Sequence, residues 1–283
     1  MTTLADLAEL VRAPAALSVP GDVIAGAAAA GALSPRTPGL AGASVLLYWA
    51  GMAANDWADR RLDAEERPER PIPSGRVTPA AAVGLAAGLT AAGVGLAAAV
   101  GGRRAAALAV PLAATIWGYD LLAKNTAAGP AVMAACRGLD VLLGASNGRM
   151  TRALPAAATV AAHTWTVTAL SRREVTGADA TLPMRTLAGT ALVAASAVAA
   201  PRRVAVLPAV LAGWYAARYG AAQAEVVRDP SAGRVRAAVG AGITGLPALQ
   251  GALTARGGAG LLGVAVAAAA PLGRRLARKV SPT

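Results

Sequence analysis

The residues best suited to chemistry form one acidic segment, NDWADRRLD, which runs from Asn55 to Asp63. Six of the fifteen acidic residues in the 283-residue chain lie between Asp56 and Glu69. On a helix, Asn55, Asp59 and Asp63 would share one face, and Asp56 would lie beside them. Carboxylates held this close repel one another unless cations neutralise them. Mg²⁺ does this well, because it takes oxygen ligands and completes its shell with water or substrate phosphate.

A second interpretation of the same segment is a solvated helix end, in which the acids pair with nearby arginines. Those arginines are Arg60, Arg61, Arg67 and Arg70. The rest of the chain decides between the two, since hydrophobic residues make up 55% of it and charged residues only 15%. An ordinary soluble domain carries about 25% charged residues. The acidic segment therefore belongs to a membrane protein.

Apolar runs that recur along the whole chain must position these residues. Each run is about 16 to 22 residues long, near the length that crosses about 30 Å of hydrocarbon. The expected spans are 15–33, 39–54, 79–100, 105–122, 130–146, 153–170, 186–200, 204–222, 235–254 and 259–273. They are rich in Ala and Gly, which lets helices approach closely. We expect an all-α polytopic membrane protein of nine or ten spans, with 1–283 as a single transmembrane domain.

The placement of basic residues predicts how the chain sits in the membrane. The net charge is +12. With a cytoplasmic N-terminus and alternating spans, most of the Lys and Arg residues fall on the cytoplasmic side, as the positive-inside rule requires. This distribution favours membrane lipid over nucleic acid as the partner. It predicts a multi-pass protein of the plasma membrane whose acidic segment and neighbouring loops face the cytoplasm.

Basic residues elsewhere could bind an anion near the acidic segment. Arg70 belongs to the loop ERPIPSGRVT, which ends a helix and whose arginines suit a metal-bound anion. The loop could instead be attracted to anionic lipid. Lys124 falls on the same predicted side. Arg137 and Asp140 lie within an apolar run, where ionisable residues usually face a bundle interior; they could also form a structural ion pair.

The sequence resembles a known family at these same motifs. NDWADRRLD followed by ERPIPSGRVTPAAA resembles the first signature of the UbiA superfamily of intramembrane prenyltransferases, in which an NDxxDxxxD motif precedes an RPxPxGxxS/T-type loop. The spacing of Tyr119 and Lys124, and the SRREVTG loop after the sixth span, extend the resemblance over most of the chain. The resemblance implies a helical bundle of about nine, at most ten, transmembrane helices around a central cavity. Two acidic motifs would face each other there and hold Mg²⁺ on the diphosphate of an isoprenoid donor.

The resemblance also implies a role for particular residues. The implied metal ligands are Asn55, Asp56, Asp59 and Asp63, with Glu174 of SRREVTG as a further candidate. The candidates for binding the donor diphosphate are Arg12, Arg70, Lys124, Arg137 and Arg173. Of these two groups, Asp59, Asp63 and Lys124 are the candidate catalytic residues, since metal ions and basic groups stabilise the leaving oxygens.

The second motif departs from the family pattern. SRREVTG keeps a single carboxylate, Glu174, and adds Arg172 and Arg173, which could contact phosphate directly. This motif and the stretch TAAGPAVMAACRGL resemble the divergent EboC-type branch of the superfamily.

These features imply a membrane prenyltransferase. It would move an isoprenoid group from a prenyl diphosphate donor to a small aromatic or lipid-precursor acceptor, with Mg²⁺ assisting the departure of diphosphate. The alternative is a non-catalytic UbiA-like protein that binds or translocates a prenylated or other small hydrophobic molecule. A purely structural scaffold would not explain the clustered acids. The oligomeric state is left open.

Overall fold

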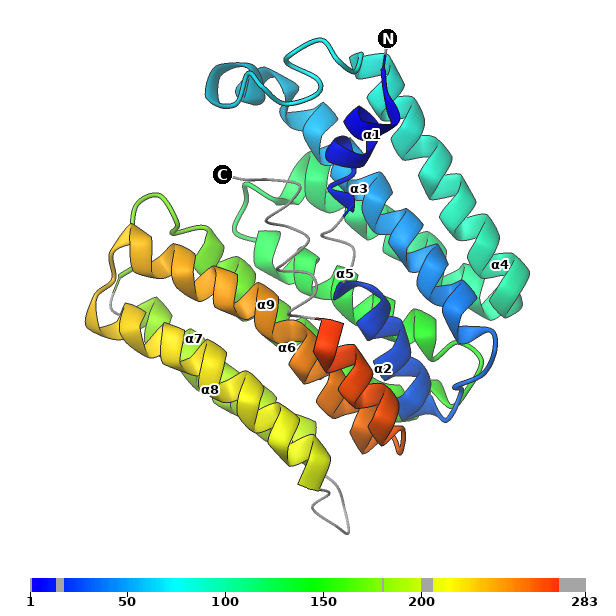
Figure 1. Cartoon of the computed structure of the whole chain (residues 1–283), viewed down its shortest axis with the longest axis vertical. Coiled ribbons are helices and arrows are strands. Elements are labelled where there is room, and N and C mark those ends of the chain that lie inside the picture. Colours follow the sequence, from blue (N-terminus) through cyan, green and yellow to red (C-terminus); the bar gives the residue numbers. More distant parts are fainter. Residues whose placement is uncertain (1, 14–17, 180, 200–205, 270–283) are drawn as a thin grey trace.

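The computed structural model describes residues 2–13, 18–179, 181–199 and 206–269, and the regular elements in these ranges are helices (Figure 1). They are α1 (Leu4–Leu10), α2 (Pro20–Ala30), α3 (Thr37–Glu66), α4 (Pro79–Gly118), η2 (Tyr119–Ala123), α5 (Gly129–Gly144), α6 (Met150–Ser171), α7 (Thr181–Val198), α8 (Val206–Arg228) and α9 (Ala232–Arg256). A short apolar helix, Gly260–Ala269, follows α9. The expected spans 15–33, 186–200, 204–222 and 259–273 each include residues outside the described ranges. The all-helical architecture is confirmed.

Local sequence signals set several helix boundaries. Proline stands in the first turn of α2, α3, α4 and α5, where its missing N–H would have had no partner. Thr78 caps α4, because its hydroxyl accepts a hydrogen bond from the Ala81 N–H at 3.2 Å. Gly31 follows the last residue of α2, and its φ of 67° is left-handed and suits glycine.

α4 reverses its direction at Gly102. This residue has a φ of 70° and a ψ of −162°, which are not helical values. Trp117 Nε1 donates a hydrogen bond to Thr90 Oγ1 at 3.0 Å, although the two residues are 27 apart in sequence. In one straight helix they would be separated by about 40 Å. The two halves of α4 therefore run side by side, and they correspond to the expected spans 79–100 and 105–122.

Helices that follow one another in the sequence mostly pack against each other, and α2 also contacts α5, α6 and α9 (Figure 1). α3 packs on α4, α5 on α6, α7 on α8 and α8 on α9, and α9 then contacts α2. One apolar cluster is built mainly from α6 to α9, and a second joins α2, α3, α4 and α5. Within the described ranges, the stretch Pro79–Ala123 is long and apolar enough to cross a membrane. The exact number of spans and the central cavity stay predictions.

Glycines bring α2 and α5 into direct backbone contact. A Cβ atom on Gly26 would lie 1.8 Å from the carbonyl oxygen of Val141, and one on Gly144 would lie 2.0 Å from that of Val23. Both distances are far below van der Waals contact. The close approach requires glycine at both positions, in keeping with small-residue packing between membrane helices.

The same helix contact encloses an ion pair. Arg137 Nε lies 2.7 Å from Asp22 Oδ2, and both side chains are buried. Asp140 instead accepts a hydrogen bond from the Ser44 hydroxyl. The pairing of Arg137 with Asp140 is therefore wrong as an alternative interpretation. The glycine contact brings the α2 carboxylate to Arg137 across the helix interface, which sequence spacing within α5 could not reveal.

Candidate functional site

The acidic segment lies at the C-terminal end of α3. This helix continues beyond the expected span 39–54 and ends at Glu66. The helical spacing expected for the segment is thus confirmed, and its acids occupy the last turns of a long helix. The four side chains are Asn55, Asp56, Asp59 and Asp63.

Two arginines from separate segments reach the first and last of the three aspartates. Asp56 Oδ1 lies 2.8 Å from Arg12 Nη2 and 3.4 Å from Arg70 Nη1. Arg70 Nη1 also lies 2.7 Å from Asp63 Oδ2. Asp56 and Asp63 are only 5% and 4% exposed. Arg70 pairs with these acids as the solvated-end interpretation expected. The burial of both carboxylates, and the approach of Arg12 from a distant segment, nevertheless differ from a solvated helix end.

A lysine from the end of η2 reaches the middle aspartate. Lys124 Nζ lies 2.6 Å from Asp59 Oδ1, and both side chains are largely buried. One helical turn before Asp59, on the same face of α3, Asn55 Nδ2 donates a hydrogen bond to Asp120 Oδ1 at 3.1 Å. A π-helical turn, a feature often found at functional sites, carries Asp120, and Lys124 follows directly at its C-terminal end. The structure therefore joins α3 and η2 by two contacts.

Asp120 is a site residue that the sequence analysis missed. It is buried, with 7% exposure. The available signal was its position four residues before Lys124 at the end of an apolar run, where a carboxylate is costly to bury. Its contact with Asn55 depends on how η2 packs against α3, which sequence spacing does not show.

The SRREVTG loop approaches the site through Arg172, and not through Arg173 or Glu174. Arg172 Nη1 donates hydrogen bonds to the backbone oxygen of Thr126 and, at 3.5 Å, to that of Lys124. Within the described ranges, neither Arg173 nor Glu174 forms an ion pair or hydrogen bond with the acids of α3. Their roles in diphosphate and metal binding stay predictions.

Glu174 has its own local environment. Burial raises the pKa of its carboxyl above the ordinary value, and the nearby Arg236 partly opposes this shift. Arg236 Nη1 also donates to the backbone oxygen of Glu174 at 2.8 Å. A carboxyl that gains a proton more readily is a weaker metal ligand.

Arg137 lies away from the acidic segment. Its guanidinium stands 5.4 Å from the ring centre of Tyr48, which precedes Asn55 by about two helical turns, or about 10 Å along α3. Its nearest charged partner is Asp22. The structure places Arg137 deep among the helices, so diphosphate binding by this residue is not supported by its contacts and stays a prediction.

The residues at the end of α3 fit a metal that arrives with a phosphate group. In the parts of the chain that the structure describes, no three Asp, Glu, His or Cys side chains are arranged to hold a metal by themselves. Mg²⁺ needs only one or two protein carboxylates when phosphate and water complete its shell. Aspartates on successive turns of one helix face can supply those oxygens.

The fold and the site together define a class of protein. The chain is an all-helical membrane bundle that gathers buried carboxylates, arginines and a lysine at one end of α3. It belongs to the UbiA prenyltransferase family, whose family model matches residues 18–224. Proteins of this family are membrane proteins.

Solved structures support the fold. The chain resembles one from a study of digeranylgeranylglyceryl phosphate synthase in membranes, with a TM-score of 0.68 and 15% identity over 90% of this chain and 98% of that one. It also resembles the apo structure of a UbiA homolog from Aeropyrum pernix K1, with a TM-score of 0.63 and 18% identity over 88% of this chain and 96% of that one.

Curated relatives are similar over part of the chain. The digeranylgeranylglyceryl phosphate synthase of Methanothrix thermoacetophila is 42% identical over 80 residues, which are 27% of this chain and 30% of the relative. That of Methanopyrus kandleri is 42% identical over 76 residues, 27% of this chain and 28% of the relative. The chain thus matches less than a third of the length of each of these two relatives.

Proposed function

We propose that this protein is an integral membrane prenyltransferase that transfers an isoprenoid group from a prenyl diphosphate to a small acceptor. The observation that carries the proposal is the convergence of Arg12, Arg70 and Lys124 on the aspartates of α3. Three cations from three segments provide donors for phosphate oxygens, and the aspartates provide oxygens for a metal. The family and the names of the relatives support the same activity.

Binding of the donor would exchange ionic partners within the site. Without a ligand, the basic side chains neutralise the aspartates. A diphosphate offers Arg12, Arg70 and Lys124 a more highly charged acceptor, and arginine can bind it through two parallel hydrogen bonds. The released Asp59 and Asp63, with Asn55 and Asp56 beside them, would hold Mg²⁺, which neutralises charge on the diphosphate.

Transfer then follows from the position of the basic side chains. The bond between the allylic carbon and the diphosphate oxygen breaks, and its electron pair leaves with the diphosphate. Arg12, Arg70 and Lys124 stabilise the negative charge that develops on the leaving oxygens. An electron pair of the acceptor forms the new bond to the allylic carbon, and the acceptor releases a proton.

We infer that the acceptor is a lipid precursor. Both curated relatives described above are named for a prenylated glyceryl phosphate, which favours a lipid precursor over an aromatic acceptor. The distribution of Lys and Arg supports a multi-pass arrangement in the plasma membrane, with the end of α3 at the cytoplasmic face.

The direct test is turnover by the purified protein in lipid nanodiscs. Mg²⁺, prenyl diphosphates of several chain lengths, and glyceryl phosphate or aromatic acceptors are supplied, and released diphosphate is measured. We expect the wild-type protein to release diphosphate and the Asp59→Ala, Asp63→Ala double variant to lose at least about a hundredfold in kcat/KM.

Asp229→Ala provides the matched control, because Asp229 is an exposed acid paired with Arg234 outside the site. It should retain wild-type turnover. Full activity in the double variant would refute the role of the α3 aspartates. Binding of donor and acceptor without release of diphosphate would instead support the non-catalytic alternative.

A further inference from the structure

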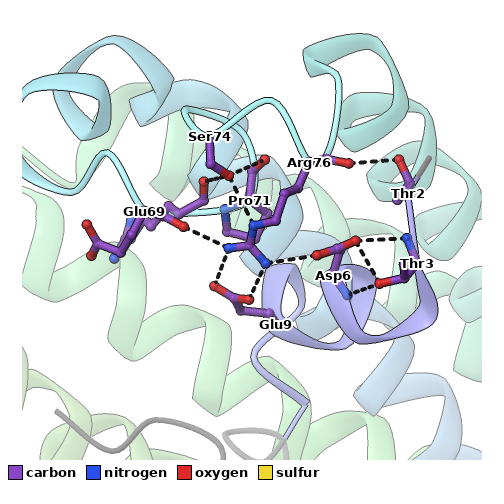
Figure 2. Close-up of polar contacts among 9 residues, drawn as sticks. Thr2, Thr3, Asp6, Glu9, Glu69, Pro71, Ser74 and Arg76 are labelled. Carbon is purple, nitrogen blue, oxygen red and sulfur yellow. Dashed lines mark hydrogen bonds and ion pairs between the residues drawn. The ribbon is translucent and has the colours of Figure 1, made fainter.

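Arg76, which no step of the proposed mechanism uses, connects the N-terminal helix to the loop between α3 and α4 (Figure 2). Its Nη1 and Nη2 atoms lie 2.7 Å and 3.0 Å from the two carboxylate oxygens of Glu9. Nη1 also lies 2.8 Å from Asp6 Oδ1. Both acids belong to α1, so a guanidinium in the loop is held by two carboxylates of the N-terminal helix.

The remaining donors of Arg76 bind its own loop. Nη2 donates to the backbone oxygen of Glu69 at 2.7 Å, and Nε donates to Ser74 Oγ at 3.1 Å. From the other side, the Thr2 hydroxyl donates to the backbone oxygen of Arg76 at 3.0 Å. All three guanidinium nitrogens are thus engaged. We call Asp6, Glu9, Glu69, Ser74 and Arg76 the Arg76 clasp.

One side of the clasp leads to Arg70. Ser74 Oγ, which accepts from Arg76, donates to the backbone oxygen of Arg70 at 2.7 Å. The Ser74 N–H donates to the same oxygen at 3.0 Å. These bonds fix the backbone from which the Arg70 side chain reaches Asp63.

The other side of the clasp leads to Arg12. α1 ends at Leu10, and Arg12 follows with a φ of 46°, a left-handed value that costs energy for a residue other than glycine. Such a conformation persists where the surrounding structure holds it. Leu10 packs in one apolar cluster with Ile72 and Val77 of the loop. The packing of α1 on the loop therefore positions Arg12 beside Asp56.

We propose that Arg76 is a positioning residue for the diphosphate of the donor. Arg76 holds α1 against the loop between α3 and α4, and this fixes the positions of Arg12 and Arg70 at the end of α3. Arg76 does not itself contact the acids of α3. The inference rests on the proposed function, in which these two arginines bind the diphosphate.

The charge of Asp6 is stable over the physiological range. Hydrogen bonds from Thr3, together with the contact to Arg76, lower the pKa of Asp6 to about 2. Asp6 therefore remains a carboxylate, and its pairing with Arg76 does not depend on pH near neutrality.

The first experiment measures donor kinetics in Arg76→Gln and Arg76→Lys. Removal of the charge should raise KM for the prenyl diphosphate about tenfold through lost donor binding, and it should also lower kcat, because Arg12 and Arg70 stabilise the leaving oxygens. Lysine should recover part of the effect, since it keeps the charge but not the paired hydrogen bonds. Arg104→Gln, which changes an exposed arginine near the reversal of α4, is the matched control and should leave both parameters unchanged.

A double-mutant cycle tests whether Arg76 acts through α1. Glu9→Gln should also raise KM, and its combination with Arg76→Gln should add little, because both changes remove the same contact. Fully additive effects, or a loss in kcat with KM unchanged, would overturn the positioning role.

Hydrogen exchange of the ligand-free protein gives a readout that does not depend on turnover. Arg76→Gln should increase exchange in residues 4–12 and 67–78 relative to Arg104→Gln, and it should weaken binding of inorganic pyrophosphate about tenfold. Unchanged exchange would overturn the clasp. Increased exchange with unchanged pyrophosphate affinity would overturn positioning. If the wild-type protein bound pyrophosphate but transferred no prenyl group, the proposed function would fail while the clasp remained supported.

Discussion

At the scale of single residues, the three aspartates of α3 do not share one cation. Asp59 pairs with Lys124, whereas Arg70 bridges Asp56 and Asp63. Removing one partner of a buried pair leaves an uncompensated charge, which costs more than the pair contributes. In the ligand-free site, the aspartates and the basic side chains neutralise one another. A metal ion can take the place of the basic side chains at the aspartates, and a diphosphate can take the place of the aspartates at the basic side chains.

Asp120 should matter for metal binding although it was not among the predicted ligands. It accepts the hydrogen bond that orients the Asn55 amide. Partners that orient a metal ligand typically contribute about 10- to 100-fold to metal affinity. We expect Asp120→Ala, which removes this acceptor, to raise the Mg²⁺ concentration for half-maximal turnover about tenfold.

Activity measured across a Mg²⁺ titration checks this prediction. Asp229→Ala serves as its control, because it removes an acid far from Asn55 in the sequence and outside the site. An unchanged Mg²⁺ requirement in Asp120→Ala would show that Asp120 does not orient Asn55 for metal binding.

The sequence allowed several residues of the site to be predicted, but not their partners. The spacing of Asn55, Asp59 and Asp63 indicated one helix face, which the structure confirms. The contact of Arg137 with Asp22 and that of Asp120 with Asn55 join different helices. Such contacts depend on how the helices are rotated and packed, and the periodicity within one helix carries no information about them.

At the scale of elements, the length of α3 and the reversal in α4 place the site. α3 extends beyond its apolar part, so its acids stand where the α3–α4 loop, η2 and the segment after α1 can reach them. The reversal at Gly102 returns the second half of α4 to the same end of the bundle and leads into η2. Gly51 permits this return, because a Cβ there would lie 2.5 Å from Ile116 Cγ2.

The contact between α2 and α5 should be sensitive to a single methyl group. A Cβ on Gly26 would collide with the backbone of α5, which cannot rotate away as a flexible side chain could. We expect Gly26→Ala to destabilise the protein by about 1–3 kcal/mol, the usual cost of overpacking. Thermal unfolding in detergent would measure the loss.

Gly88→Ala is the corresponding control on α4. Beyond the backbone of its own helical turn and its two chain neighbours, no heavy atom lies within 4 Å of a Cβ at that position, and alanine favours a helix more than glycine does. Its melting temperature should be equal to or slightly above that of the wild-type protein. Equal stability of the two variants would show that α2 and α5 do not approach as closely as described.

At the scale of the whole molecule, hydrophobic run lengths were sufficient to predict an all-helical membrane bundle. The run lengths also predicted two separate spans over the residues of α4. The hydrogen bond between Trp117 and Thr90 shows that these two halves run antiparallel. The contact between α2 and α9 was not predictable, since it joins helices far apart in the chain. That 1–283 forms a single transmembrane domain stays a prediction, as does the resemblance to the EboC-type branch.

The most direct test of the central claim is calorimetric binding of a non-reactive prenyl thiolodiphosphate to the wild-type protein and to the Asp59→Asn, Asp63→Asn double variant. The site described here predicts binding to the wild-type protein that requires Mg²⁺, and affinity at least about tenfold weaker in the double variant or in the presence of EDTA. Equal affinity in all of these conditions would contradict the assignment of the α3 aspartates to a metal and diphosphate site.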